Sequence, residues 1–386
     1  MSVNPMQPRT AEEVRDCVLE ALGAGEKIEI RGGGTKADVG RTIDGVQLLD
    51  MRALSGVVDY DPAELVLTVL AGTPLDEVKA LLEERGQMLA FDPFDHGPLF
   101  GKEAGAATIG GVVAAGVAGS QRLACGGARD HILGFRAVSG RGEMFVGGGK
   151  VVKNVTGYDL PKIMAGSWGR LAALTELTLK VLPRPPERMT LALRGLDEMA
   201  AISAMAKALG SPADVAACAH LPEGEGAGRP LTLIRLQGVG PSVAARAAAL
   251  EDLLTPIGAA VRLQKEESDR HWHSLTTLSM LGSGPLWRVS VPPSKGAAIA
   301  AVVRALDGRW ALDWGGGQVW AAFEGGAGEL RRAATEAGGH ASLIRADRIV
   351  RDAVPAFHPP LPGVAALEDR VRRSFDPQGI FETGRF

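Results

Sequence analysis

Glycine runs in the first half of this chain limit its possible folds more than any other feature of the sequence. The chain of 386 residues contains 51 glycines. Before residue 170 they gather in five short segments: RGGG, ATIGGVVAAGVAG, ACGGARD, GGGK and GSWGR. A residue without a side chain is needed where the backbone turns sharply or packs closely against another surface. The first half therefore folds with many tight turns, or with its backbone against a large ligand.

The segment KIEIRGGGTK, residues 27–36, poses this choice most sharply, because an alternating apolar stretch runs directly into three glycines. It fits neither common phosphate loop. G-x-G-x-x-G needs spaced glycines that open a helix, and the Walker A motif needs Gly-Lys-Ser/Thr. For this segment alone, a tight hairpin turn is the simpler interpretation. The other glycine segments are needed to choose between a simple turn and a backbone that lies against a ligand.

The composition indicates a soluble globular protein of two or three domains. Hydrophobic residues make up 46% of the chain and the formal net charge is −3, with no block of Lys and Arg for nucleic acid. The apolar stretches are too short to span a bilayer, and residues 1–10 show no export signal. Cys17, Cys125 and Cys218 are scattered, which is typical of a reducing, cytoplasmic protein without a Cys-ligated iron–sulfur cluster.

Residues 1–184 are predicted to form one α+β domain. A capping box at Thr10 and the helical spacing of apolar residues predict a helix over 11–23. Pro74 at a first helical position, with Thr73 as its cap, predicts a second helix that ends near Gly86. Strands are expected at 27–30, 46–49, 57–60, 65–70, 134–139, 143–147 and 171–183. Three prolines in PRPPE, residues 183–187, mark the domain boundary.

Residues 185–345 are predicted to form a second α+β domain. Strands and helices follow a β-α-β-β-α-β order from 189 to 264, and this order partly recurs from 286 to 345. Two such halves predict one antiparallel sheet with helices on one face. The remaining residues, 346–386, carry a helix and then the turn-rich stretch FDPQGIFETGRF.

Three segments ask for one explanation: RGGGTK, residues 107–122 and residues 153–183. The first places backbone N–H groups and Lys36 at a glycine turn, which suits a pyrophosphate. The second has Gly or Ala wherever a planar ring could rest. The third ends in an alternating strand that GSWGRL precedes. Together they favour a large ligand over simple turns.

Over residues 1–184 the chain resembles the FAD-binding domain of the vanillyl-alcohol oxidase and p-cresol methylhydroxylase (PCMH) family. The family run N-V-x-G-Y-D-L-x-K-x-x-x-G-S-x-G-x-L matches Asn154 to Leu171. The resemblance implies a two-lobed PCMH-type domain, a ferredoxin-like α+β cap domain over 185–345, and a C-terminal segment, 346–386, that returns to the FAD domain. The cofactor-binding residues it implies are Arg31, Gly32, Gly33, Gly34, Thr35, Lys36, Thr108, Ile109, Gly110, Gly111, Ala115, Gly116, Gly119, Ser120, Arg122, Asp130, Gly169, Leu171 and Leu174.

Further motifs extend the resemblance over nearly the whole chain, to the smaller FAD-binding subunit (the E subunit) of glycolate oxidase. They are FDPFDHGPLFGKEAGAATIGG, DWGGGQVW, FHPPLP and FDPQGIFETGRF. Such subunits act with a larger FAD subunit and an iron–sulfur subunit, and the complex oxidises glycolate, a small 2-hydroxy acid, to glyoxylate. The resemblance implies the same function and partners here. It implies non-covalent FAD, because Thr35 and Lys36 stand where FAD-linked members usually carry His.

Candidate catalytic residues are few. Members that oxidise 2-hydroxy acids alone carry an H-x-G-D-G-N-x-H signature, and this sequence has none. His358 in FHPPLP, and Arg345 and Arg348 in LIRADRIVR, are weak candidates, because a structural histidine and a solvated face explain them as well. No metal site is expected, since His271 and His273, at i and i+2, would point to different faces of a helix.

Three interpretations follow for the function. The chain is the FAD-carrying subunit of a glycolate oxidase, a self-sufficient FAD-dependent D-2-hydroxy-acid dehydrogenase of the D-lactate type, or a docking scaffold. The missing histidine signature favours the first over the second, and the intact glycine segments disfavour the third. The expected location is cytoplasmic, at the inner face of the membrane only through partner subunits.

Overall fold

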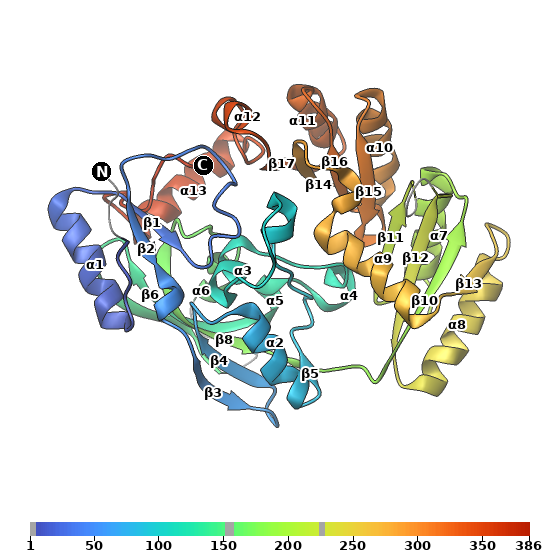
Figure 1. The fold of residues 1–386 in the computed structure, drawn as a ribbon, viewed down its shortest axis with the longest axis horizontal. Coiled ribbons are helices and arrows are strands. Elements are labelled where there is room, and N and C mark those ends of the chain that lie inside the picture. Colours follow the sequence, from blue (N-terminus) through green and yellow to red (C-terminus); the bar gives the residue numbers. More distant parts are fainter. Residues whose placement is uncertain (1–4, 151–157, 224–227) are drawn as a thin grey trace. The chain divides into compact units, whose positions relative to one another are not determined.

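The computed structural model describes residues 5–150, 158–223 and 228–386, and these divide into two compact units (Figure 1). Unit 1 holds the described residues up to Gly119, from Gly126 to Arg184 and from Pro359 onward. Unit 2 holds 120–125 and the described residues of 185–358. The division after Arg184 lies at the expected boundary. The expected segment 346–386 is itself divided, because its first part, up to His358, stays with unit 2.

Unit 1 contains a five-stranded antiparallel sheet in the order β3-β4-β8-β6-β7 and a small parallel pair, β1-β2. Its strands are β1 (Ile28–Arg31), β2 (Gln47–Asp50), β3 (Val57–Asp61), β4 (Val66–Leu70), β5 (Gln87–Met88), β6 (Ile132–Ser139), β7 (Met144–Gly148), β8 (Ala172–Lys180) and β9 (Leu182–Pro183). Its helices are α1 (Ala11–Ala24), α2 (Leu75–Glu84), α3 (Ile109–Ala115), α5 (Ala128–His131), α6 (Leu160–Met164) and α13 (Pro362–Phe375).

The caps of α1 and α2 show one expectation met and one corrected. Thr10 caps α1, because its side chain accepts a hydrogen bond from Glu13 N–H, and Gly25 ends the helix in the left-handed conformation. Thr73 does not cap α2. Its hydroxyl instead donates to Leu70 O at 2.7 Å, and Pro74 occupies the cap position without a side-chain hydrogen bond. Thr73 therefore closes the preceding turn rather than the helix.

The last residues of the chain complete the core of the first lobe of unit 1. Val14 and Val18 of α1 pack with β1 and β2 and with Ile380 and Phe381, all in one buried cluster. The backbone follows the same route, since Ile28 N–H donates to Ile380 O at 2.7 Å. The segment that carries FETGRF is therefore held beside β1, where the RGGGTK loop begins.

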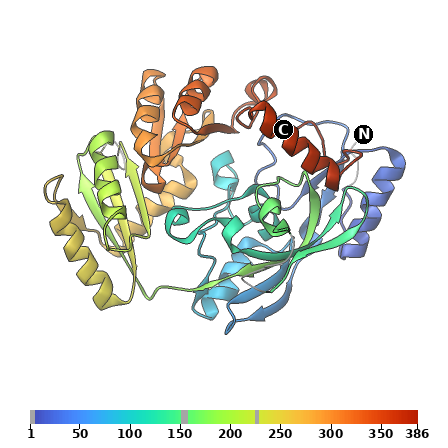
Figure 2. The ribbon, with the colours of Figure 1, turned by 180° about the vertical axis from the view of Figure 1, so that it is seen from behind.

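Unit 2 is one eight-stranded antiparallel sheet in the order β13-β10-β12-β11-β15-β16-β14-β17 (Figures 1 and 2). Its strands are β10 (Glu187–Arg194), β11 (Ala217–Leu221), β12 (Leu231–Gly238), β13 (Ala260–Arg262), β14 (Leu286–Ser290), β15 (Arg309–Asp313), β16 (Gln318–Ala322) and β17 (His340–Arg345). Its helices are α4 (Arg122–Cys125), α7 (Glu198–Leu209), α8 (Gly240–Leu254), α9 (Lys265–Thr277), α10 (Gly296–Ala305), α11 (Ala327–Glu336) and α12 (Arg348–Ala353).

Helices cover both faces of this sheet, which corrects the expectation of a single covered face. Helices α7, α8, α10 and α11 share the larger core with one face. On the opposite face, Trp272 and Leu275 of α9 pack on Ala192, Leu233 and Ala311. The Trp272 indole N–H donates to Thr190 Oγ1 at 3.0 Å, so α9 is fixed by a buried hydrogen bond as well as by packing. Among the described helices, none is long and apolar enough to cross a membrane.

Candidate functional site

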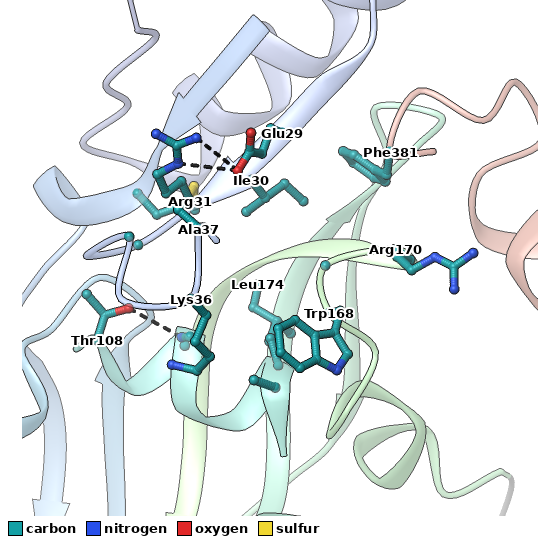
Figure 3. A pocket seen from close by; sticks show the side chains of 18 of the residues that line it. Glu29, Ile30, Arg31, Lys36, Ala37, Thr108, Trp168, Arg170, Leu174 and Phe381 are labelled. Atoms are coloured by element: carbon teal, nitrogen blue, oxygen red, sulfur yellow. Dashed lines mark hydrogen bonds and ion pairs between the residues drawn. The ribbon is translucent and has the colours of Figure 1, made fainter. Parts of the chain in front are cut away.

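A pocket that is partly open to solvent lies within unit 1 (Figure 3). Four segments line it: residues 28–37, residues 108–115, residues 168–174 and the end of the chain from Phe381.

Each of the three glycines of the RGGGTK loop is required at its position for a different structural reason. A Cβ on Gly33 would lie 1.4 Å from Ala106 O, and one on Gly32 would lie 2.2 Å from Thr108 Oγ1. The loop backbone thus lies directly against the residues that precede α3. Gly34 has a φ of 71°, a conformation that favours glycine. The backbone of the RGGGTK loop therefore packs in large part against residues 106–108 of the same chain.

The N–H groups of this loop are its main chemical feature. Among the described residues, no acceptor of the chain receives a hydrogen bond from the backbone N–H of residues 32–36. Successive N–H groups around a left-handed glycine form a concavity that binds anions. The loop, at the wall of the pocket, is therefore built to receive a negatively charged group.

Lys36 adds a positive charge to the same wall. Lys36 lines the pocket, and Figure 3 shows its side chain among those of the other lining residues. Burial lowers the pKa of Lys36 to about 8, and Asp95 acts in the opposite direction. Its one recorded hydrogen bond in the described chain is the 3.3 Å contact of Nζ with Thr35 Oγ1. An ammonium held in this way is stabilised when an anion binds beside it.

Helix α3 supplies shape rather than anion-binding groups. The N–H groups of Ile109, Gly110 and Val112 donate to Thr73 O, Ala71 O and Thr108 O at 2.8–2.9 Å. Gly111 N–H donates to the Thr108 side chain at 3.3 Å. The first-turn donors of α3 are therefore occupied, whereas the N–H groups of the RGGGTK loop have no acceptor in the described chain.

At Gly110 and Gly116, contacts or backbone conformation within the protein already explain why glycine is present, without a ligand. A Cβ on Gly110 would lie 2.6 Å from Ala71 O, and Gly116 ends α3 with a φ of 63°. Gly111 differs, because its Cβ would meet one side-chain atom, Thr108 Oγ1 at 3.2 Å, and Gly111 lines the pocket. Of these three α3 glycines, Gly111 is the one whose missing side chain serves the pocket.

Replacing Gly111 with alanine is expected to weaken ligand binding about 10- to 100-fold, because overpacking a filled site costs about 1–3 kcal/mol. The fold should be kept or slightly stabilised, since alanine is the better helix former. Titration of the unliganded protein with FAD, read by flavin fluorescence, measures the effect. Gly23→Ala in α1, where a Cβ meets nothing within 4 Å, is the matched control. Unchanged affinity in Gly111→Ala would show that the ligand does not reach α3.

The floor of the pocket is apolar. Ile28, Met51 and Phe381 are almost fully buried, and Leu174 lies with them along the lining. Trp168 has a φ of 56°, and its backbone N–H donates to Ala114 O at 2.8 Å. These two features fix the backbone at Trp168, which lines the pocket. A flat aromatic group can rest on such a floor while its charged part meets the loop.

A shared carboxylate stands at one edge of the pocket. Glu29 Oε1 accepts from Arg31 Nη2 at 3.0 Å and from Arg385 Nη2 at 2.6 Å. Two guanidinium groups on one carboxylate leave a net positive charge at this edge. Arg170 is committed elsewhere, to Glu382, and Figure 3 shows its guanidinium directed away from the other labelled side chains.

The structure brings most of the predicted cofactor-binding residues together. Those that line the pocket are Arg31, Gly32, Gly33, Gly34, Thr35, Lys36, Thr108, Gly110, Gly111, Ala115, Gly169 and Leu174. Ile109 and Leu171 are buried behind the lining, and Gly116 ends α3. Gly119 lies against Asp92, and Asp130 accepts from Gly127 N–H at 2.8 Å, so neither lines the pocket.

Ser120 and Arg122 belong to unit 2. Ser120 Oγ donates to Asp313 Oδ2 at 2.8 Å, and the Arg122 guanidinium lies 4.5 Å from the Trp314 ring centroid. These partners are nearly two hundred residues away in sequence, which is why the glycine-loop motif alone did not separate them from the pocket residues.

The three weak catalytic candidates also belong to unit 2 and not to the pocket. Ala341 N–H donates to His358 Nδ1 at 3.3 Å, so the ring proton is on Nε2, which donates to Thr335 Oγ1 at 3.0 Å. Burial and the nearby Arg331 lower the pKa of His358, in keeping with this neutral form. Arg345 donates to Gly284 O and Gly282 O, and Arg348 pairs with Asp352 at 3.5 Å. These contacts give each residue a structural role.

Several pocket residues went unrecognised in the sequence. They are Ile28, Glu29, Ile30, Ala37, Met51, Ala71, Ala114, Trp168, Arg170, Ala172, Phe381, Thr383, Arg385 and Phe386. The GSWGR and FETGRF motifs pointed to the right segments, but only the fold shows which of their side chains face the pocket. Among the described residues, no group of three or more His, Cys, Asp or Glu could hold a metal ion.

Comparison with known proteins identifies the family. Residues 6–148 match a family model described as an FAD binding domain, and this range contains the RGGGTK loop and α3. The chain is 34% identical over 368 residues to the glycolate oxidase subunit GlcE of Escherichia coli (strain K12), covering 95% of both chains. This chain belongs to the GlcE family. It is thus an FAD-binding oxidoreductase of the glycolate oxidase family.

Two further comparisons place the GlcE family among wider relatives. The chain is 30% identical over 186 residues to the glycolate oxidase subunit GlcD of Bacillus subtilis (strain 168), which covers 48% of this chain and 38% of GlcD. A crystal structure of p-cresol methylhydroxylase with substrate bound has the same fold, with a TM-score of 0.72, 16% identity, and coverage of 98% of this chain and 87% of the other. The PCMH-type fold expected from the sequence is confirmed.

Proposed function

We propose that this chain is the FAD-carrying subunit of a glycolate oxidase, and that the assembled complex oxidises glycolate to glyoxylate. The observation that carries the proposal is the unit 1 pocket, which residues 32–36 line; their backbone N–H groups have no acceptor in the described chain, and Lys36 adds an ammonium group to the same lining. The similarity to GlcE over nearly the whole chain supports the substrate and the subunit role. A cytoplasmic location belongs to the same proposal.

The residues present fit FAD in both charge and shape. The N–H groups of the RGGGTK loop and Lys36 would hold the pyrophosphate. The apolar floor around Ile28, Met51 and Phe381 would hold a flat ring. When bound, FAD supplies a two-electron acceptor for oxidation of the substrate.

The pocket binds but offers no general base. Its titratable lining residues in the described chain are Glu29, Arg31, Lys36, Arg170 and Arg385. Glu29 is the one carboxylate, and it already accepts from two guanidinium groups. A carboxylate held in this way is a poor acceptor for a substrate proton. We therefore assign proton removal from glycolate to a larger flavin subunit, and the exit of electrons to an iron–sulfur subunit.

The self-sufficient D-2-hydroxy-acid dehydrogenase remains the alternative. It requires a base and a carboxylate-binding cation that meet at the flavin. His358, Arg345 and Arg348 have other hydrogen-bond or ion-pair partners among the described residues, and these contacts do not favour this alternative.

The purified chain is expected to be yellow and to release free FAD on acid precipitation. None of the residues that line the pocket in the described structure is a His, Cys or Tyr that could form a covalent bond to the flavin. Absorbance of the supernatant and of the redissolved pellet measures the partition. Flavin that stays with the pellet would contradict non-covalent binding. A colourless protein that takes up no added FAD would contradict the cofactor assignment.

A further inference from the structure

One face of the unit 2 sheet changes from apolar to polar across its width. Helix α9 packs on the apolar half, which β10, β11, β12 and β15 form. The other half consists of β16, β14 and β17. In β14, Trp287 and Val289 belong to the larger core on the opposite face. Because side chains alternate along a strand, Arg288 between them points to the same face as α9.

The strand register places polar and aromatic neighbours around Arg288. On this face Arg288 lies directly opposite Trp320 of β16 and Ser342 of β17. His340 is the preceding residue of β17 on the same face. Directly opposite residues in a sheet have Cβ atoms about 4.5–5.5 Å apart, and diagonal residues about 7–8 Å. Arg288 therefore stands among an indole, a hydroxyl and an imidazole, all within unit 2.

Arg122 of α4 brings a second guanidinium group to this cluster. Burial and the charge of Arg122 both lower the pKa of Arg288. Burial is also the main cause that lowers the pKa of His340, and the charges of Arg288 and Arg122 contribute. The three groups are therefore close enough to repel one another. No carboxylate of the described chain offsets these effects on Arg288 or His340.

The partly buried guanidinium of Arg288 is left without an acceptor. No hydrogen bond or ion pair joins it to another group in the described part of the chain. By contrast, Arg194, Arg262 and Arg304 of the same unit each pair with a glutamate. Burial of an uncompensated charge is costly, and a bound anion compensates it. The paired N–H donors of a guanidinium match the two oxygens of a carboxylate.

We propose that Arg288, supported by Arg122 and Ser342, binds the carboxylate of a small 2-hydroxy acid on unit 2. The proposal rests on the proposed function, because it takes glycolate as the ligand. Arg288 donates to the carboxylate oxygens, and the charge of Arg122 strengthens the attraction. His340 is a poor base here, since a proton on its ring would stand near two guanidinium groups. The site therefore holds the substrate without removing its proton, in keeping with a base on a partner subunit.

Equilibrium dialysis of radiolabelled glycolate against the FAD-loaded chain tests this site by binding alone. Arg288→Met should weaken glycolate binding about 10- to 100-fold, because it removes a hydrogen bond between charged groups. Arg288→Lys keeps the charge but not the paired donors, so its loss should be smaller. Glycolamide, the uncharged analogue, should compete poorly with glycolate. Arg262→Met is the matched control, because Arg262 pairs with Glu251 at 2.6 Å on the edge strand β13.

Thermal unfolding shows whether Arg288 instead has a structural role. Without ligand, Arg288→Met should be at least as stable as the wild type, because the substitution removes a charge that has no acceptor. Glycolate should raise the melting temperature of the wild type and leave that of Arg288→Met unchanged. A variant that folds but melts well below the wild type would show that Arg288 stabilises the sheet, and would overturn the proposal.

Equal glycolate binding by the wild type and Arg288→Met would overturn the site, and so would equal binding of glycolate and glycolamide. A wild-type chain that takes up FAD but binds no glycolate would overturn it as well. If Arg288→Met binds glycolate normally but no longer co-purifies with co-expressed partner subunits, Arg288 binds a carboxylate of a partner instead. A wild-type chain that takes up no FAD would contradict the proposed function, and glycolate binding can still be measured on that chain.

Discussion

Replacing Lys36 with methionine is expected to weaken FAD binding about 10- to 100-fold at pH 7 and, at the same time, to stabilise the unliganded protein. The weakening follows because a hydrogen bond to a charged group contributes about 1.5–3 kcal/mol. The stabilisation follows because methionine is close in length to lysine and removes a charge whose burial the fold opposes. Opposite effects on binding and on stability mark Lys36 as a ligand-binding residue.

The pH dependence gives this prediction a second signature. The pKa of Lys36 is lowered to about 8 in the unliganded fold, against 10.5 as its ordinary value. Below pH 8 the side chain is charged in both the free and the FAD-bound protein, so affinity is flat. A bound pyrophosphate raises this pKa, so affinity falls as the pH rises above 8, and Lys36→Met should lose this dependence.

The stability of the unliganded protein also depends on pH through Lys36, but it changes with pH in the opposite direction to the affinity for FAD. Between about pH 8 and 10.5 the unfolded chain holds a proton on Lys36 that the folded, unliganded chain has released. The free energy of unfolding therefore rises with pH across this window through Lys36, and the methionine variant should lack that rise.

Equilibrium titration with FAD between pH 6.5 and 10, together with thermal unfolding of the unliganded proteins, measures both effects. Lys102→Met is the control, since Lys102 is exposed and pairs with Asp38 at 2.7 Å. Wild-type affinity in Lys36→Met, or a wild-type affinity that stays level up to pH 10, would remove Lys36 from the binding site.

Local features of this fold were predictable from the sequence, because local rules govern them. The capping box at Thr10 places the start of α1 where it lies, and alternating residues place β4 and β8 within a few positions of where they lie. The RGGGTK loop was recognisable because its glycines have few alternatives. Thr73 was misassigned because its hydroxyl prefers the turn behind it to the helix ahead.

The long-range part of the site was beyond sequence reasoning. Glu29 and Arg385 are 356 positions apart, and nothing in the periodicity of either segment links them. The structural reasons for Gly110 and Gly116 were also not visible in the sequence. Gly110 lies against Ala71 and lines the pocket, and Gly116 has a left-handed backbone conformation. Packing between distant segments decides such roles.

The second large effect concerns activity. The isolated chain, loaded with FAD, is expected to oxidise glycolate at least about 10²–10⁴-fold more slowly than the complex, which is the range a missing general base accounts for. The described pocket offers no carboxylate or imidazole that is available to accept the substrate proton. Co-expression with the two partners proposed above, a larger flavin subunit and an iron–sulfur subunit, should restore glycolate-dependent dye reduction.

A complex assembled with Lys36→Met, depleted of FAD, is the control that ties activity to this pocket. It should reduce dye more slowly than the wild-type complex and recover when FAD is added in excess. Wild-type activity in the depleted complex would mean that FAD in this chain has no part in the reaction.

Anaerobic addition of glycolate to the FAD-loaded chain, with absorbance followed near 450 nm, tests the central claim most directly. The flavin band of the isolated chain should persist after a stoichiometric addition, while that of the reconstituted complex should bleach. Rapid bleaching of the isolated chain would contradict the account and would establish a self-sufficient 2-hydroxy-acid dehydrogenase.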